Sequence, residues 1–128
     1  MQDFYWFIIF IAANSALLLL LGVNVSRLRI KKKIAWGDGE DKDLMKAIRT
    51  HANGTEQVPI YALIILALCF IKASTIVLSA LVVVFTLSRV IQAVGMLFKQ
   101  PLLRQVGAGL TFASQGFAVL ALQVSLVL

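Results

Sequence analysis

The sequence is poor in the residues that build a water-soluble surface or a covalent cross-link. Only 6 of its 128 residues are acidic and 14% are charged, whereas 60% are hydrophobic. A soluble domain of this size has to cover its core with polar side chains, so this balance excludes one. Cys69 is the single cysteine, which rules out an internal disulfide or a thiolate metal site within the chain, and we expect no bound metal. A lipid bilayer is the solvent that suits this composition.

Long apolar segments dominate the chain. A helix that spans a bilayer needs about 20 apolar residues. The segments predict four spanning helices, at about residues 4–25, 43–71, 74–98 and 101–128, within one domain covering residues 1–128. The predicted fold class is all-α, an integral membrane four-helix bundle. We expect an acidic cap at Asp43, a kink at Pro59 and a helix that begins at Pro101.

The basic residues are distributed unequally among the connections. Eight lysines and arginines lie between the first two helices, and Lys99 and Arg104 flank the third connection, but the second connection has only Lys72. By the positive-inside rule, the first and third connections are cytoplasmic and both termini lie outside. Since these cations lie at the ends of apolar segments, topology explains them better than a nucleic-acid partner does, and we expect no such partner.

Three sets of polar residues interrupt the predicted spans, where charge is costly and marks a functional site. Arg49, Asn53 and Glu56 follow one another at i, i+4 and i+7, so they share one helix face. That face offers a cation, an amide and a carboxylate to a polar ligand. A salt-bridged helix end is the alternative explanation. Arg89 lies about 14 Å from the end of the third helix at 1.5 Å per residue, so we expect it to pair with Glu56.

Arg104 falls in the first turns of the fourth helix. It is placed to bind phosphate headgroups or to complete an anion-binding cluster with Arg27, Arg29 and Arg49. A site with several arginines, one carboxylate and one amide suits a small zwitterionic ligand with more than one carboxylate. These residues alone indicate a ligand class and no reaction.

The same residues carry a family resemblance that spans nearly the whole chain. The segment 47–59 holds an arginine, a histidine, an asparagine and a glutamate, followed by a proline, at Arg49, His51, Asn53, Glu56 and Pro59. This pattern resembles the bacterial branch of the MAPEG family, the membrane-associated proteins in eicosanoid and glutathione metabolism. The chain also resembles this family at Gly37 to Gly39, Leu44, Arg27 to Arg29, Arg89 and Arg104.

The resemblance implies a homotrimer in the bacterial inner membrane that uses glutathione as a cosubstrate. Its function would be that of a transferase or peroxidase acting on lipophilic electrophiles dissolved in the bilayer. Glutathione would bind between protomers, near the cytoplasm, and Arg104 would stabilise its thiolate as the catalytic residue. The residues implied in binding are Arg27, Arg49, Asn53, Glu56, Arg89 and Gln92.

Three positions depart from the pattern of the glutathione-active members. Ala52 replaces an arginine that precedes the asparagine, while Gln92 and Met96 replace a histidine and a tyrosine of the third helix. Met96 cannot donate a proton. A non-catalytic membrane protein that binds a small anionic ligand or lipid is therefore an alternative. A small cation transporter is disfavoured, because Asp3 is the only acid of the first helix.

Overall fold

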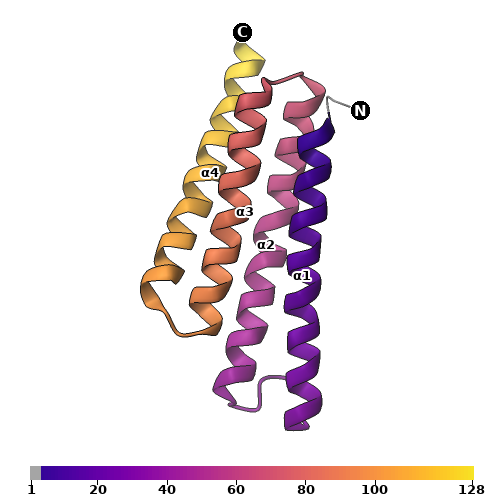
Figure 1. Ribbon diagram of the computed structural model, residues 1–128, viewed down its shortest axis with the longest axis vertical. Coiled ribbons are helices and arrows are strands. Elements are labelled where there is room, and N and C mark those ends of the chain that lie inside the picture. Colours follow the sequence, from indigo (N-terminus) through magenta and orange to yellow (C-terminus); the bar gives the residue numbers. More distant parts are fainter. Residues whose placement is uncertain (1–3) are drawn as a thin grey trace.

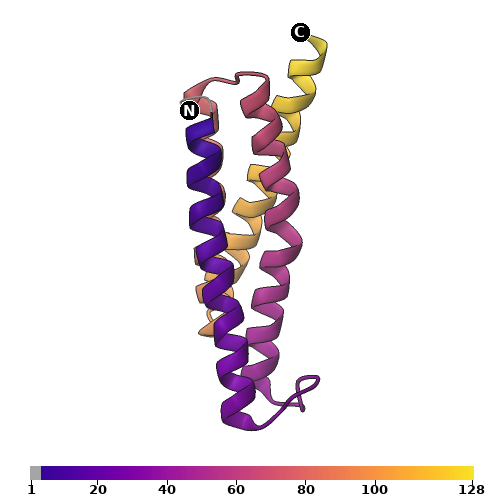
Figure 2. The same cartoon turned by 90° about the vertical axis from the view of Figure 1, so that its right-hand side faces the viewer.

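The computed structural model describes residues 4–128 and forms a bundle of four long helices (Figures 1 and 2). Asp3 lies outside the described residues. The helices are α1 (Tyr5–Lys32), α2 (Lys42–Phe70), α3 (Thr75–Leu97) and α4 (Pro101–Val127), and residues 4–128 contain no β-strand. All four are long and apolar enough to cross a membrane. The predicted all-α four-helix membrane bundle is thus confirmed.

The first helix is longer than predicted. It continues to Lys32 rather than ending near Val25, so most of the basic run is helical. The prediction was wrong because a charged segment ends membrane insertion without ending a helix, and residues 26–32 contain no glycine or proline. The helix ends where Lys33 takes a left-handed conformation, and Arg29 donates hydrogen bonds to carbonyl oxygens of the following loop, the shortest at 2.7 Å to Gly37.

The second helix begins at Lys42, one residue earlier than expected. Its cap is Asp41 and not Asp43, since the Asp41 carboxylate accepts a hydrogen bond from the Leu44 N–H at 2.9 Å. The same carboxylate accepts from the Lys32 ammonium at 2.8 Å, which joins the ends of α1 and α2. Hydrogen bonds from Lys32 and then Leu44 hold the pKa of Asp41 below its usual value. Pro59 lies within the helix, which continues through it.

The last two helices form the closest pair of the bundle. Ser74 caps α3 by accepting from the Val77 N–H at 3.2 Å, and Pro101 is the first residue of α4, as predicted. Two glycines allow the backbones to approach: a Cβ on Gly107 would lie 2.6 Å from the backbone nitrogen of Gln92, and one on Gly95 would collide with the backbone nitrogen of Arg104. The start of α4 is therefore held directly against α3.

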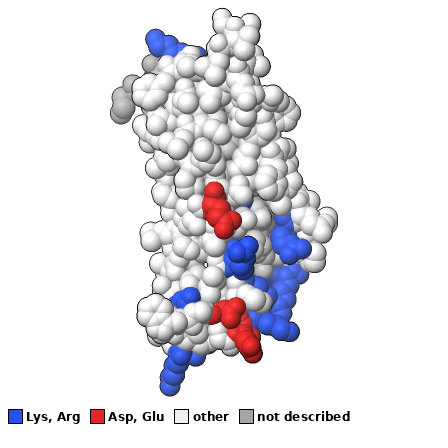
Figure 3. Space-filling model, turned by 180° about the vertical axis from the view of Figure 1, so that it is seen from behind, with Lys and Arg blue, Asp and Glu red and all other residues white. Residues whose placement is uncertain are grey.

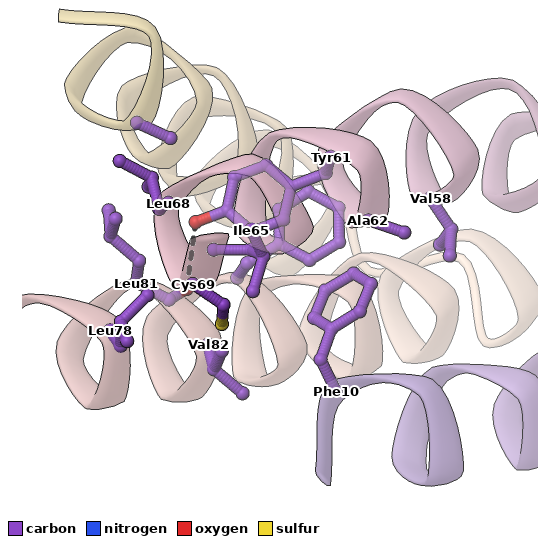
Figure 4. Close-up of a cluster of buried hydrophobic side chains, with 12 residues drawn as sticks. Phe10, Val58, Tyr61, Ala62, Ile65, Leu68, Cys69, Leu78, Leu81 and Val82 are labelled. Carbon is purple, nitrogen blue, oxygen red and sulfur yellow. Dashed lines mark hydrogen bonds between the residues drawn. The ribbon is translucent and has the colours of Figure 1, made fainter. Parts of the chain in front are cut away.

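Aromatic rings fill the core between α1, α2 and α3 (Figure 4). Tyr61 and Phe85 stack with ring centroids 3.8 Å apart, and Phe10 lies 5.5 Å from each of them. The Tyr61 hydroxyl donates to the Leu81 carbonyl oxygen at 2.8 Å, which satisfies a polar atom that would otherwise be buried alone. This cluster fixes the upper half of the bundle in Figure 1, at the end opposite the α1–α2 loop and its basic residues.

The two helical hairpins differ in reach. At 1.5 Å per residue α3 is about 35 Å long, close to the hydrocarbon thickness of about 30 Å, whereas α1 is about 42 Å long. The α3–α4 turn consequently stops short of the α1–α2 loop, as both views show (Figures 1 and 2). We call the end of the bundle that holds this turn and this loop the basic end. The candidate site lies at the step that forms where the α3–α4 turn ends short of the α1–α2 loop.

Candidate functional site

Arg89 is buried inside the bundle and is held by neutral groups. Its side chain is 5% exposed and donates to Asn53 Oδ1 and Gln92 Oε1, each at 2.6 Å, with Thr111 Oγ1 at 3.5 Å. The predicted Arg89–Glu56 pair is wrong. Glu56 is exposed, and within residues 4–128 it forms no ion pair or hydrogen bond. Two amide oxygens satisfy the guanidinium, while the three-residue step from Asn53 to Glu56 rotates the carboxylate outward.

A ladder of polar contacts extends from this arginine to α4. Ser88 and Thr111 share a hydrogen bond at 2.9 Å, and Thr111 also donates to the Gly107 carbonyl at 2.8 Å. Further along, Gln115 donates to Gln57 at 2.5 Å, which links α4 to α2. Buried polar groups of this kind cost little when each has a partner, so the ladder joins three helices around Arg89.

A cationic cleft opens at the step between the two hairpins, and we refer to it by that name. It has a volume of about 510 Å³. It is lined by Met45, Lys46, Arg49, Gly95, Met96, Lys99, Pro101 and Arg104. Four of these side chains are cations and none is an acid. Charged side chains gather on the corresponding half of the molecule in Figure 3, whereas the other half is almost entirely uncharged.

The backbone adds to the positive field of the cleft. Helix α4 begins at its edge with Pro101, and no side chain within residues 4–128 caps its first N–H groups. The N-terminus of a helix carries a partial positive charge and free donors, both of which favour an anion. Gly95 permits this arrangement, because a side chain there would displace the backbone of Arg104. The cleft is therefore built to attract negative charge.

The other arginines of the predicted cluster lie elsewhere in the protomer. Arg27 donates to Asn24 Oδ1 at 2.8 Å and lines a second hollow of about 350 Å³ between α1, α2 and the end of α3. Arg29 is engaged by loop carbonyl oxygens. Lys46 lines both the hollow and the cleft. Arg49 and Arg104 thus line one cleft, and Arg89 contacts Asn53 and Gln92. Arg27 and Glu56 are in neither group.

Comparison with known proteins identifies the family of the chain. Residues 7–124 match the MAPEG family. The chain belongs to the MAPEG family. The inner membrane protein YecN of Escherichia coli strain K12 is 43% identical over 56 residues, and YecN of Escherichia coli O6:H1 strain CFT073 matches to the same extent. Each match covers 43% of this chain and 43% of the relative, and the name of these relatives indicates a membrane but no reaction.

The structure gives the positions that depart from the glutathione-active MAPEG pattern a clear environment. The Gln92 side-chain oxygen accepts a hydrogen bond from the Arg89 guanidinium, so this amide helps to hold Arg89 in place. Met96 lines the cationic cleft and contributes a thioether where a hydroxyl group would be able to donate. The lining of the cleft in this MAPEG chain therefore contains four cationic side chains and no hydroxyl group.

Two lining residues were missed in the sequence. Lys46 precedes Arg49 by three residues and shares its face, although from the sequence it is assigned only to the topology. Lys99 lies in the α3–α4 turn with a φ of 54°, and this left-handed backbone directs the chain into the turn. The spacing of Lys46 could have revealed it, whereas Lys99 becomes a neighbour of Arg49 only through the packing of α4 on α3. His51 faces α1 at Gly22, away from the cleft.

Proposed function

We propose that this protein is a membrane-embedded, glutathione-dependent transferase or peroxidase that acts on lipophilic electrophiles. The MAPEG family includes glutathione transferases and peroxidases. The observation that carries the proposal is the meeting of Arg49 and Arg104 in one cleft whose lining contains no acid. Such a cleft would bind the two carboxylates of glutathione and favour ionisation of its thiol.

The cations have distinct tasks in this reaction. Arg49 and Lys46 would bind glutathione carboxylates, and Arg104 would lie beside the sulfur, where a cation lowers a thiol pKa and raises the thiolate fraction. The thiolate donates its electron pair to an electrophilic carbon, forming a C–S bond as the leaving group departs. With a hydroperoxide, two glutathione molecules give the disulfide, the alcohol and water.

The buried cluster would position the ligand rather than react with it. Arg89 occupies the Asn53 Oδ1 atom, which leaves the amide N–H groups of Asn53 for a ligand oxygen. Glu56 offers an unpaired carboxylate to the glutathione ammonium. Because Arg27 and Glu56 lie apart from the cationic cleft in one protomer, we propose a homotrimer in which neighbours bring these groups to a shared site.

One observation favours a second candidate function. Met96 lines the cleft without a proton to donate, so the cleft is equally suited to holding an anion that does not react. In that case the protein binds a small anionic ligand or lipid without catalysis.

Glutathione binding tests the proposal most directly. Calorimetry on the detergent-purified protein should show binding by the wild type, and Arg104→Ala and Glu56→Ala should each abolish it. Lys72→Ala is the matched control, because this exposed lysine lies at the opposite end of the bundle. Ultraviolet absorbance of bound thiolate should disappear in Arg104→Ala. If the folded wild type binds no glutathione, the proposal is rejected and the second candidate function, non-catalytic binding of an anion or lipid, remains.

A further inference from the structure

The cationic cleft carries more positive charge than glutathione can neutralise. Lys46, Arg49, Lys99 and Arg104 line it, and the uncapped N-terminus of α4 adds a partial charge. The glutathione thiolate form carries three negative groups and one ammonium, a net charge of about −2 at neutral pH. Among the described residues, Lys46 is the only one of these cations in an ion pair, with Asp43 at 3.6 Å. Lys99 and Arg104 therefore face the cleft with their charge uncompensated among residues 4–128.

The rim of the cleft is apolar and lies at the depth of lipid headgroups. The exposed side chains Phe98 and Leu102, at 68% and 71%, flank the α3–α4 turn. Because α3 is about as long as the hydrocarbon core is thick, this turn falls at the membrane surface. An arginine one turn into α4 and a lysine in the turn then face the phosphate layer, with apolar groups directed toward acyl chains.

We propose that the cationic cleft is also a binding site for an anionic phospholipid. The phosphate of the lipid lies between Lys99 and Arg104, its acyl chains leave past Phe98 and Leu102, and Arg49 and Lys46 contribute at longer range. A phosphate on an amphiphile can accept from both Lys99 and Arg104 while its acyl chains cover the apolar rim, and a water-soluble peptide has no group that covers the rim.

A regulatory consequence rests on the proposed function. If glutathione uses Arg49 and Arg104, a lipid phosphate in the same cleft competes with it. The apparent glutathione dissociation constant then rises with the anionic lipid content of the membrane, without any change in the protein. The lipid site is argued from the uncompensated cations, the position of the turn at the membrane surface and the apolar rim. It does not depend on glutathione binding.

Lipid retention tests the site first. Native mass spectrometry of the full-length protein, titrated with phosphatidylglycerol or phosphatidylcholine in detergent, should show selective retention of phosphatidylglycerol. Lys99→Gln should weaken that retention about fivefold, the equivalent of about 1 kcal/mol for one lysine near an anionic surface. Lys33→Gln is the control, since Lys33 is an exposed lysine of the same end that lines neither hollow. Equal losses in the two variants, or no selectivity between lipids, overturn the proposal.

Soluble glycerol phosphate separates a lipid from a free phosphate ester. Binding of glycerol phosphate as tight as that of phosphatidylglycerol overturns the lipid assignment, whereas much weaker binding supports it, because the acyl chains then contribute. Glutathione titrations in nanodiscs with and without phosphatidylglycerol complete the test. Unchanged glutathione affinity overturns the competition and leaves the proposed function intact. Retention of lipid with no glutathione binding in either nanodisc supports the lipid site and rejects the proposed function.

Discussion

Arg89 of α3 donates to Asn53 Oδ1 of α2 at 2.6 Å, and a neutral amide thereby holds a cation in the middle of the membrane bundle. The nearest acid in sequence to Asn53, Glu56, points outward and remains unpaired within the described protomer. This arrangement has a chemical advantage for a binding site. A carboxylate engaged by Arg89 would be unavailable to a ligand, whereas an amide partner leaves the acid available.

Removing the Asn53 side chain should destabilise the bundle. Asn53→Ala leaves part of the buried guanidinium without an acceptor, a cost of about 1–3 kcal/mol in the free energy of unfolding. Denaturant titration in detergent, followed by helical circular dichroism, measures it. Thr55→Ala is the control on the same helix, because Thr55 is exposed and bonds only to the local Ala52 carbonyl, and its effect should stay within about 0.5 kcal/mol. Equal stabilities for the two variants contradict the role of Asn53.

Two glycines of α4 should respond in opposite ways to the same substitution. In Gly107→Ala the new methyl group lies 2.6 Å from the Gln92 backbone nitrogen, so α3 and α4 must separate, at a cost of about 1–3 kcal/mol. Gly109→Ala meets nothing within 4 Å in the protomer and should stabilise the helix by about 0.5–1 kcal/mol. Thermal unfolding of both variants measures the difference. A destabilised Gly109→Ala protein would indicate a neighbouring protomer against that face.

The junction between α1 and α2 should weaken in acid. Lys32 and the Leu44 N–H lower the pKa of Asp41 in the folded protein, so the stability it contributes is present above its unfolded value of 3.8. That contribution is lost as the pH falls through the lower folded pKa. Asp41→Asn keeps a cap acceptor but cannot titrate or pair as an anion. The difference in unfolding temperature between wild type and Asp41→Asn should therefore shrink on acidification below about pH 4, and a constant difference contradicts this linkage.

Cysteine labelling should establish the orientation of the bundle. We expect Ala35→Cys, in the α1–α2 loop, to react with a membrane-impermeant maleimide only after cell lysis, and Thr75→Cys, at the opposite end, to react in intact cells. Both are made in a Cys69→Ala background, and Cys69 is buried. The background protein alone should not label. The reverse pattern would place both termini in the cytoplasm and the cationic cleft outside.

Most of the fold could be predicted because long apolar runs specify spanning helices with few alternatives. The end of α1 could not, because Lys31 and Lys32 stop insertion while remaining good helix formers. Likewise, both Asp41 and Asp43 are chemically able to cap α2, and only the backbone geometry of the loop selects Asp41.

The candidate site was predicted in its parts rather than in its arrangement. Helical spacing correctly put Arg49, Asn53 and Glu56 on one side of α2, but spacing does not say which of them α3 will meet. Asn53 and Glu56 are three residues apart, so their side chains leave the helix in different directions. The Asn53 amide accepts from Arg89, and the Glu56 carboxylate does not. The cationic cleft depends on the close helix approach at Gly95 and on the reversal of the chain at Lys99. Neither feature produces a periodic pattern of residues in the sequence.

The short reach of the α3–α4 hairpin has a kinetic consequence. A reactant at the step would contact the aqueous phase and the acyl chains at once, so the proposed reaction draws its two substrates from different phases. The working concentration of the lipophilic substrate is then its concentration in the bilayer, set by its partition coefficient. Among electrophiles of equal intrinsic reactivity, turnover at a fixed total concentration should follow partitioning, and swelling the lipid volume should slow the reaction by dilution alone.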